Sequence, residues 1–148
     1  MPNEVSLEVY TFKVRKKGQK KDYEILSQFP RKEADFYAFF EHYFRHHDKE
    51  PMFHKELKKT IRISEKDLVF DEKHRMVSGI MESGDFGKEG IIIDASGNTK
   101  YKKSKEESDI EPYYYLVYVP DNFKTGFMVT QRTGIHGIHN IFTRNILD

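Results

Sequence analysis

The chain has 148 residues, of which 33% are charged and 14% are aromatic, and it contains no cysteine. This length suits one domain with a buried core of its own. Without cysteine, disulfides and thiolate metal sites are excluded, and a reducing cytoplasm is the expected location. No apolar run approaches the roughly 20 residues that cross a membrane, so we expect a soluble protein without membrane contact. The net charge of +1 excludes a uniformly basic nucleic-acid binder but allows a local basic patch.

The beginning of the chain predicts a long strand, because residues 5–15 alternate at a period of two. The apolar residues up to Val9 face one side and those from Tyr10 onward face the other. We therefore expect a bulge there that brings both sets to a core. A basic loop follows at residues 15–21. Residues 23–29 are expected to return as a second strand, which would give a hairpin with a charged tip.

A helix is predicted over residues 32–47, because five aromatic residues recur at helical spacing: Phe36, Phe39, Phe40, Tyr43 and Phe44. We interpret this stripe as part of the core. His42 and His46 share a face of the same helix and could supply half of a metal site. The glutamate that follows the first histidine in zinc proteases is missing, and a third ligand would have to come from His54 or His74. Exposed histidines are the preferred interpretation, and no metal or other cofactor is expected.

The middle of the chain predicts short strands separated by turns, at residues 60–64, 68–70, 74–82, 91–93 and 99–103. The three isoleucines of residues 91–93 are expected to be buried. Gly79 indicates a bulge or a close approach of another residue within its strand. Residues 94–98 combine Asp, Ser, Gly and Asn, which predicts a turn.

Residues 113–119 and 127–131 are the most apolar and most β-prone part of the chain, with a turn beginning at Pro120. The first of these strands is apolar on both faces. We expect the aromatic helix to cover one face and the last helix or a partner to cover the other. Residues 134–147 carry apolar residues near one face and predict a closing helix.

These elements predict a single α+β domain over residues 1–148. It combines a mainly antiparallel curved sheet with an aromatic-rich helix in the N-terminal half and a C-terminal helix. The sequence stops directly after the last apolar residue, without a glycine or proline that would signal a helix exit. Two interpretations stay open: the chain is the N-terminal part of a longer protein, or its last helix simply ends.

Three basic clusters could contact a phosphate backbone if the fold brings them to one face. Tyr23 and Tyr101 lie nearby in the sequence and could stack on bases. If the clusters scatter, they serve as solubility charges. The candidate nucleic-acid-binding residues are Arg15, Lys16, Lys17, Lys20, Lys21, Lys58, Lys59, Arg62, Lys102 and Lys103.

His136 and His139 lie three residues apart on the predicted last helix. A metal-independent ribonuclease needs a base for the 2′-hydroxyl, an acid for the leaving oxygen and a cation for the phosphate. Two histidines with Arg132 or Arg144 could supply these catalytic roles. A structural or interface role is the more frequent use of such a pair. Phosphate loops, nucleotide-binding glycine patterns and nucleophile elbows are absent from the sequence.

The segment EPYYYLVYVP, followed by GFMVTQRTGIHGI, resembles part of the N-terminal half of uncharacterised bacterial proteins, some thought to be linked to defence against phage. The resemblance covers at most the last third of the chain. It is a pattern of strand, turn, strand and helix, so no functional residues are carried over from it. It implies a sensing or nucleic-acid-associated module of a larger bacterial protein.

Three functions follow as hypotheses. The leading one is a non-enzymatic binding module of an intracellular bacterial protein that contacts nucleic acid or a protein partner. The alternatives are a small metal-independent ribonuclease and an oligomerisation domain whose tyrosine-rich surface is the contact site.

Overall fold

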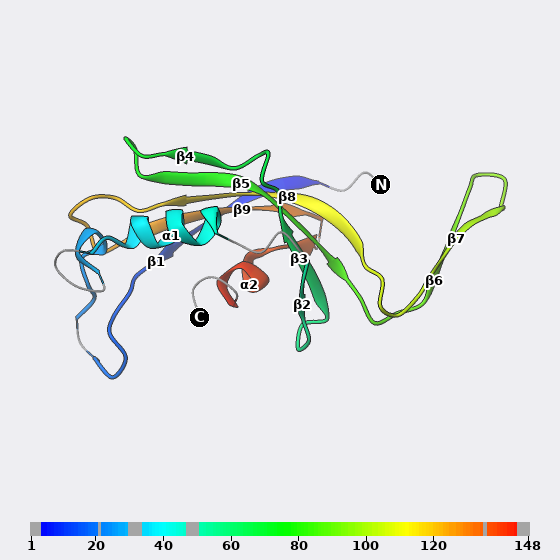
Figure 1. The fold of residues 1–148 in the computed structure, drawn as a ribbon, viewed down its shortest axis with the longest axis horizontal. Coiled ribbons are helices and arrows are strands. Elements are labelled where there is room, and N and C mark those ends of the chain that lie inside the picture. Colours follow the sequence, from blue (N-terminus) through cyan, green and yellow to red (C-terminus); the bar gives the residue numbers. More distant parts are fainter. Residues whose placement is uncertain (1–3, 21, 30–33, 47–50, 135, 145–148) are drawn as a thin grey trace.

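The computed structural model describes residues 4–20, 22–29, 34–46, 51–134 and 136–144, and its fold is α+β. Its centre is an open antiparallel sheet in the order β1-β9-β8-β5-β3-β2, with β4 beside β5 and β10 beside β9. Figure 1 shows this sheet bending along its length. The strands are β1 Val5–Phe12, β2 Met52–His54, β3 Lys59–Ile63, β4 Val69–Asp71, β5 Met76–Asp85, β8 Asp109–Tyr118, β9 Gly126–Thr133 and β10 His136–Gly137. The predicted fold class is confirmed, as is the central hairpin that β8 and β9 form.

A separate hairpin of β6 (Gly90–Ile93) and β7 (Thr99–Lys103) stands away from the main sheet, at the right of Figure 1. The predicted turn joins its strands, and the Asp94 carboxylate accepts the backbone N–H groups of Ser96 and Asn98 at 2.9 Å. The expected burial of residues 91–93 is wrong. All three isoleucines are exposed, because the hairpin projects beyond the core.

Two helices and one 3₁₀ turn complete the described fold: α1 Phe36–Arg45, α2 His139–Phe142 and η1 Leu26–Gln28. α1 begins later than predicted because Asp35 caps it, its carboxylate accepting the Tyr37 N–H at 2.9 Å. Residues 32, 33 and 47 of the predicted helix lie outside the described residues. The predicted stripe is largely buried, although Phe39 is exposed. No described helix has the length and apolar character needed to span a membrane.

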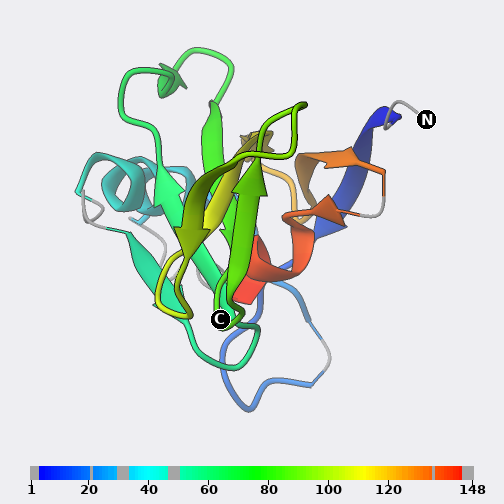
Figure 2. The ribbon, with the colours of Figure 1, turned by 90° about the vertical axis from the view of Figure 1, so that its right-hand side faces the viewer.

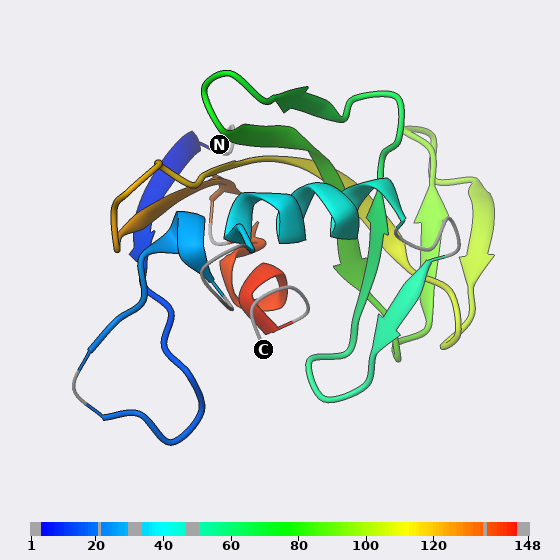
Figure 3. The same ribbon diagram turned by 60° about the vertical axis from the view of Figure 1, so that its left-hand side comes forward.

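Both helices lie on the same face of the main sheet, as Figures 1 and 3 show. The ring of Tyr115 on β8 is 5.2 Å from Phe44 of α1 and 5.3 Å from Phe142 of α2, measured between ring centroids. The expectation that the last helix covers the opposite face is therefore wrong. One aromatic residue of the sheet contacts both helices, and the second face is left without them.

The side chains of β8 alternate between the two faces of the sheet. On the face that the helices cover they are buried: Tyr113, Tyr115 and Val117. On the opposite face, which we call the outer face, they are half-buried: Tyr114, Leu116 and Tyr118. The strand is apolar on both faces, as the sequence predicts, but helices cover only one of them.

Gly79 of β5 lies opposite Tyr115 and makes room for its hydroxyl. A Cβ at this position would come within 2.9 Å of the Tyr115 hydroxyl oxygen. The predicted close approach is confirmed, and the pairing of β5 with β8 continues past this glycine without a bulge. Burial raises the pKa of Tyr115, whose hydroxyl has no hydrogen-bond partner among the described residues.

β1 pairs with β9 along its whole length without a register shift, so the expected bulge is wrong. Tyr10 and Phe12 pack against the core. Val5, Leu7 and Val9 remain on the outer face, where 62%, 59% and 66% of each residue is exposed. A straight strand can turn only one set of side chains toward the helices, and the even-numbered set takes that place.

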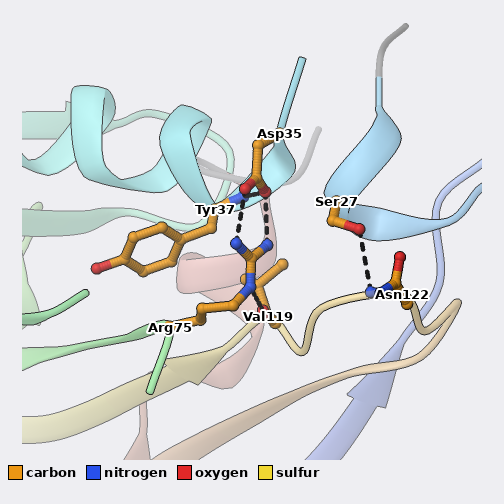
Figure 4. A network of polar contacts seen from close by, with 6 residues as sticks. All are labelled: Ser27, Asp35, Tyr37, Arg75, Val119 and Asn122. Carbon is orange, nitrogen blue, oxygen red and sulfur yellow. Dashed lines mark hydrogen bonds and ion pairs between the residues drawn. The ribbon is translucent and has the colours of Figure 1, made fainter. Parts of the chain in front are cut away.

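Residues 23–29 contain the 3₁₀ turn η1 and do not form the expected return strand. Leu26 is fully buried, and its N–H donates to the carbonyl of Phe123 at 2.9 Å. The N–H of Asn122 donates to the Ser27 hydroxyl at 3.0 Å (Figure 4). These contacts attach the segment to the turn between β8 and β9. The Glu24 N–H also donates to the Val14 carbonyl, beyond the end of β1, at 2.8 Å, but the segment does not pair with β1 as a strand.

The closing helix predicted over residues 134–147 is much shorter in the structure. Gly134 lies in a turn with a φ of +60°, a conformation that glycine adopts readily. The chain then runs back along β9 as β10, and α2 begins only at His139. Residues 145–148 lie outside the described part of the chain. His136 is therefore on a strand and His139 on a helix, which corrects the expectation that one helix carries both.

Arg75 attaches α1 to the sheet (Figure 4). Its guanidinium donates two hydrogen bonds of 2.6 Å to the Asp35 carboxylate, and its Nε donates to the carbonyl of Val119 at 2.6 Å. Its backbone has a φ of +57°, and its carbonyl accepts the Val119 N–H at 3.0 Å. One residue thereby joins the cap of α1, the turn before β5 and the end of β8.

The surroundings of Asp35 shift its acidity in opposing directions. Burial raises the pKa of Asp35, but the Arg75 hydrogen bonds, the Tyr37 N–H and the charge of Arg75 together outweigh it. The pKa therefore lies below its ordinary value. Because the lowered pKa belongs to the folded state, the pair stabilises the fold above the pKa of an unfolded aspartate. This contribution is lost as the pH falls through the lowered pKa.

We predict that Asp35→Asn lowers the free energy of unfolding by about 2 kcal/mol at neutral pH, because a partly buried guanidinium loses its carboxylate. The difference from the wild type should shrink as the pH falls through the lowered pKa of Asp35, because the wild-type carboxyl then becomes protonated as well. Urea unfolding at several pH values measures both effects. The control is Glu41→Gln, which removes an exposed pair with Arg45 and costs at most about 0.5 kcal/mol. If both variants lose the same free energy of unfolding, the contact of Arg75 with Asp35 does not stabilise the fold more than an exposed surface ion pair does.

Candidate functional site

A small cavity lies at the edge of the main sheet, where β1, β9 and α2 meet. Figure 2 shows β1, β10 and α2 on this side of the molecule, where β9 separates β10 from β1. The cavity has a volume of about 250 Å³. We call it the histidine cavity, and its lining consists of Glu8, Tyr10, Arg132, Gly137, His139 and Asn140.

Direct contacts fix the side chains of the histidine cavity. The ring of His139 stacks on that of Tyr10, with centroids 3.6 Å apart and planes inclined by 13°. The Tyr10 hydroxyl donates a short hydrogen bond to the Glu8 carboxylate. Arg132 donates from Nη1 to Glu8 at 3.1 Å and from Nε to the carbonyl of Gly134 at 2.8 Å. The Nδ1 atom of His139 is buried and has no hydrogen-bond partner among the described residues.

These contacts also set the acidity of the cavity. The hydrogen bond from Tyr10, followed by that from Arg132, lowers the pKa of Glu8 against the opposing effect of burial. The same bond to Glu8, together with burial, raises the pKa of Tyr10. In neutral solution Glu8 is therefore a carboxylate and Tyr10 a neutral phenol.

His136 lines a neighbouring cavity of about 300 Å³, which shares Gly137 with the histidine cavity. Three lysines and three carboxylates give this second cavity mixed charge: Lys59, Lys88, Lys103, Asp85, Asp109 and Glu111. The Nζ atom of Lys59 lies 2.5 Å from Oδ1 of Asp85. This hydrogen bond, with the charges of Lys59, His136 and Lys88, lowers the pKa of Asp85 although burial opposes it. The structure thus brings Arg132 and His139 together in the histidine cavity and places His136 in the adjoining cavity.

The first cluster of candidate nucleic-acid-binding residues lies apart from the others. Arg15, Lys16, Lys17 and Lys20 are exposed in the loop after β1, and Lys21 lies outside the described residues. In Figure 1 this loop is at the lower left of the molecule, whereas β7 is at the far right. The structure does not bring all three clusters to one place.

The remaining candidates lie in or beside β3 and β7: Lys58, Lys59, Arg62, Lys102 and Lys103. Both candidates on β3 are paired with carboxylates, Lys59 with Asp85 and Arg62 with Glu82 at 2.8 Å. Lys59 and Lys103 line the same cavity. Two basic clusters therefore meet beside His136, but acidic residues accompany them.

No described trio of His, Asp and Glu side chains is placed to hold a metal ion. The rings of His42 and His46 are 4.3 Å apart on α1, as their spacing suggests. Neither proposed third ligand joins them. His54 accepts the N–H of Leu57, and the imidazole of His74 pairs with Asp71 at 2.9 Å.

The outer face of the main sheet is an apolar surface. One row of directly opposed residues crosses five strands: Val9, Val129, Leu116, Ser78 and Val69. In the next row the rings of Phe127 and Tyr118 stack with centroids 6.0 Å apart. More than half of Val5, Leu7, Val9 and Val69 is exposed.

Charged groups lie only at the margin of this surface. The polar residues that share its rows on β1, β5 and β9 are uncharged: Thr11, Ser78, Gln131 and Thr133. The nearest charged residues in register are Asp71 on β4 and the ion pair of Arg62 with Glu82. The outer face therefore offers hydrophobic contact and little electrostatic attraction.

No family model matches the chain, and neither a curated protein nor a solved structure matches it. Its function therefore has to be inferred from the surfaces and cavities described above.

Sequence reasoning missed Glu8 and Tyr10 as partners of Arg132 and His139. The alternation of the first strand does place Glu8 and Tyr10 on one face, so half of the signal is visible in the sequence. The pairing of β1 with β9 brings together residues from opposite ends of the chain. No local pattern predicts that pairing.

We predict that Tyr10→Phe and Arg132→Gln each raise the pKa of Glu8. The larger rise should follow Tyr10→Phe, since the Tyr10 hydrogen bond is the strongest influence on this carboxylate. NMR titration of the Glu8 side-chain carboxyl carbon measures the change. Lys16→Gln, in the loop after β1, serves as the control and leaves the titration unchanged. If Glu8 titrates identically in all three variants, the contacts of the cavity do not form in solution.

Proposed function

We propose that the chain is a binding module whose contact surface is the outer face and whose partner is a second copy of the chain. The exposure of Val5, Leu7 and Val9, in register with the apolar residues of β9 and β8, supports this most strongly. Monomeric soluble proteins rarely expose contiguous apolar surface of more than a few hundred Å². A surface of this kind is usually covered in the working assembly.

The size of the outer face fits an interface between proteins. More than half of Val5, Leu7, Val9 and Val69 is exposed on this face, so the apolar surface of each copy is on the order of a few hundred Å². Each partner of a standard protein interface buries about 800 Å². Two copies would therefore bury an area at the lower end of the range for specific complexes, with a polar rim from the residues around the apolar rows.

The chemistry of the outer face favours a second copy over a charged partner. Nucleic acid requires cations, and Arg62, the only cation among the described residues in register with this face, is paired with Glu82. Two copies with a net charge of +1 repel each other little. A two-fold interface needs a patch that is complementary to itself, and a neutral apolar sheet face meets this condition. Two such faces can pack about 10 Å apart, as the layers of β-sandwiches do.

The setting that we propose for this assembly is the cytoplasm of a bacterium. The absence of cysteine is consistent with a reducing compartment. The resemblance of residues 111–138 to bacterial proteins thought to be linked to phage defence favours a module within a larger defence protein.

We predict that the chain sediments with about twice the mass of one copy at micromolar concentration. Leu7→Lys and Val9→Lys should each weaken self-association by about 100-fold or more, because an ammonium group would be buried in an apolar interface without a partner. Analytical ultracentrifugation over a range of concentrations measures the dissociation constants.

Ile92→Lys is the matched control, because Ile92 is an exposed isoleucine on the separate β6–β7 hairpin. This variant should associate as the wild type does. A wild-type protein that remains a monomer at high micromolar concentration would overturn the proposal. If Ile92→Lys weakens self-association as much as the outer-face variants do, the interface does not lie on the outer face.

A second candidate function is contact with nucleic acid through the loop after β1. Its cations form no ion pair with a described residue: Lys13, Arg15, Lys16, Lys17 and Lys20. The charged groups of Lys13 and Arg15 lie 5.2 and 5.9 Å from the ring centroid of Tyr23. An exposed aromatic ring among unpaired cations is typical of surfaces that bind single strands.

We predict that the chain retains single-stranded RNA or DNA in a salt-sensitive manner. Replacing Lys16, Lys17, Lys20 and Lys21 together by glutamine should weaken retention by about 10-fold or more and flatten its salt dependence. Filter binding at several salt concentrations measures both. Replacing Lys66 and Lys73 by glutamine is the control, because both are exposed and neither belongs to a candidate binding cluster. If the loop variant retains RNA or DNA as the wild type does, the loop lysines do not bind nucleic acid.

A further inference from the structure

The histidine cavity holds reactive side chains that the binding function leaves unused. Glu8 and Tyr10 come from β1, Arg132 from β9 and His139 from the start of α2. They lie within one hydrogen-bonded and stacked group, and a buried imidazole nitrogen of that group has no partner among the described residues. A carboxylate, an imidazole and a guanidinium around one cavity are the set of groups used in metal-independent phosphodiester chemistry.

Arg132 is positioned to hold an anion. Its Nε and Nη1 atoms are occupied by Gly134 and Glu8, which fix the plane of the guanidinium. Its Nη2 atom has no hydrogen-bond partner among the described residues, so its N–H groups are free to contact a phosphoryl oxygen. A guanidinium held in this way is suited to the charge that develops on a phosphoryl group during transfer.

His139 and Glu8 can move protons. The Tyr10 ring holds the imidazole of His139 in one orientation at the cavity wall. An imidazole can donate and accept a proton in neutral solution. Glu8 is a carboxylate there and lines the same cavity, so it can accept a proton. The hydrogen bonds from Tyr10 and Arg132 hold it in place and make it a weaker base than a free carboxylate.

We propose that the histidine cavity cleaves RNA by transferring the phosphodiester to the neighbouring 2′-oxygen. The proton of the 2′-hydroxyl passes to the Glu8 carboxylate, and the 2′-oxygen bonds to phosphorus. The bond from phosphorus to the 5′-oxygen breaks, and that oxygen takes a proton from the His139 imidazolium. The products are a 2′,3′-cyclic phosphate and a 5′-hydroxyl, and the step needs no co-reactant.

The structure changes the set of residues that the sequence suggested for this chemistry. Glu8 takes the role of base, while His136 lies in the adjoining cavity with Lys59, Lys88 and Lys103. Arg144 pairs with Glu56 at 3.0 Å and does not line the histidine cavity.

The test is incubation of the purified chain with single-stranded RNA, and with DNA of the same sequence, in excess chelator at about pH 6.5. We expect RNA fragments that end in cyclic phosphate and intact DNA, since DNA lacks the attacking hydroxyl. Glu8→Gln and His139→Gln should slow cleavage by at least about 100-fold. Intact RNA after long incubation with the wild type, or cleavage of DNA, would overturn the proposal.

Two further variants separate this activity from other effects. His74→Gln changes an exposed histidine in the turn before β5 and should cleave as the wild type does. Leu7→Lys, which disrupts the outer face, should also keep cleavage, so that loss of self-association and loss of activity are distinguishable. If His139→Gln unfolds, Glu8→Gln alone decides the outcome, and wild-type rates in that variant would exclude Glu8 as the base.

Discussion

The bidentate contact of Arg75 with Asp35 attaches the first helix to the face of the sheet that it covers. Arg75 lies in the turn before β5 and also bonds to the end of β8, so the cap of α1 is attached to the two central strands at once. With α1 in this place, Phe44 reaches Tyr115 from one side of the sheet. The short α2 packs beside it on the same face and completes the core.

This arrangement leaves the outer face uncovered and gives β1 two roles. Its odd-numbered residues, such as Leu7, add an exposed apolar row to the outer face. Its even-numbered residues Glu8 and Tyr10 line the histidine cavity on the face of the helices. A single edge strand therefore contributes to a contact surface and to a polar cavity. Because successive side chains of a strand point to opposite faces, the two sites can act independently.

The sequence predicts the features that depend on local patterns. The alternation of residues 113–131 and the spacing of Phe36, Phe40 and Phe44 are local signals, and the elements they predict are present. The predicted length of the last helix is wrong, because the turn at Gly134 and the pairing of β10 with β9 interrupt the apolar pattern that suggested one long helix. The outer face and the histidine cavity depend on contacts between distant segments. No pattern within a single sequence predicts which face of a sheet two helices will both cover.

The most direct test of the bare outer face uses the absence of native cysteine. A single cysteine in Val9→Cys can be labelled with a thiol reagent at increasing protein concentration, with Ile92→Cys for comparison. A second copy seated on the outer face should slow labelling of Val9→Cys as the concentration rises and leave Ile92→Cys unaffected. If the labelling rate of Val9→Cys does not fall as the protein concentration rises, as it should not for Ile92→Cys, the result would contradict the account.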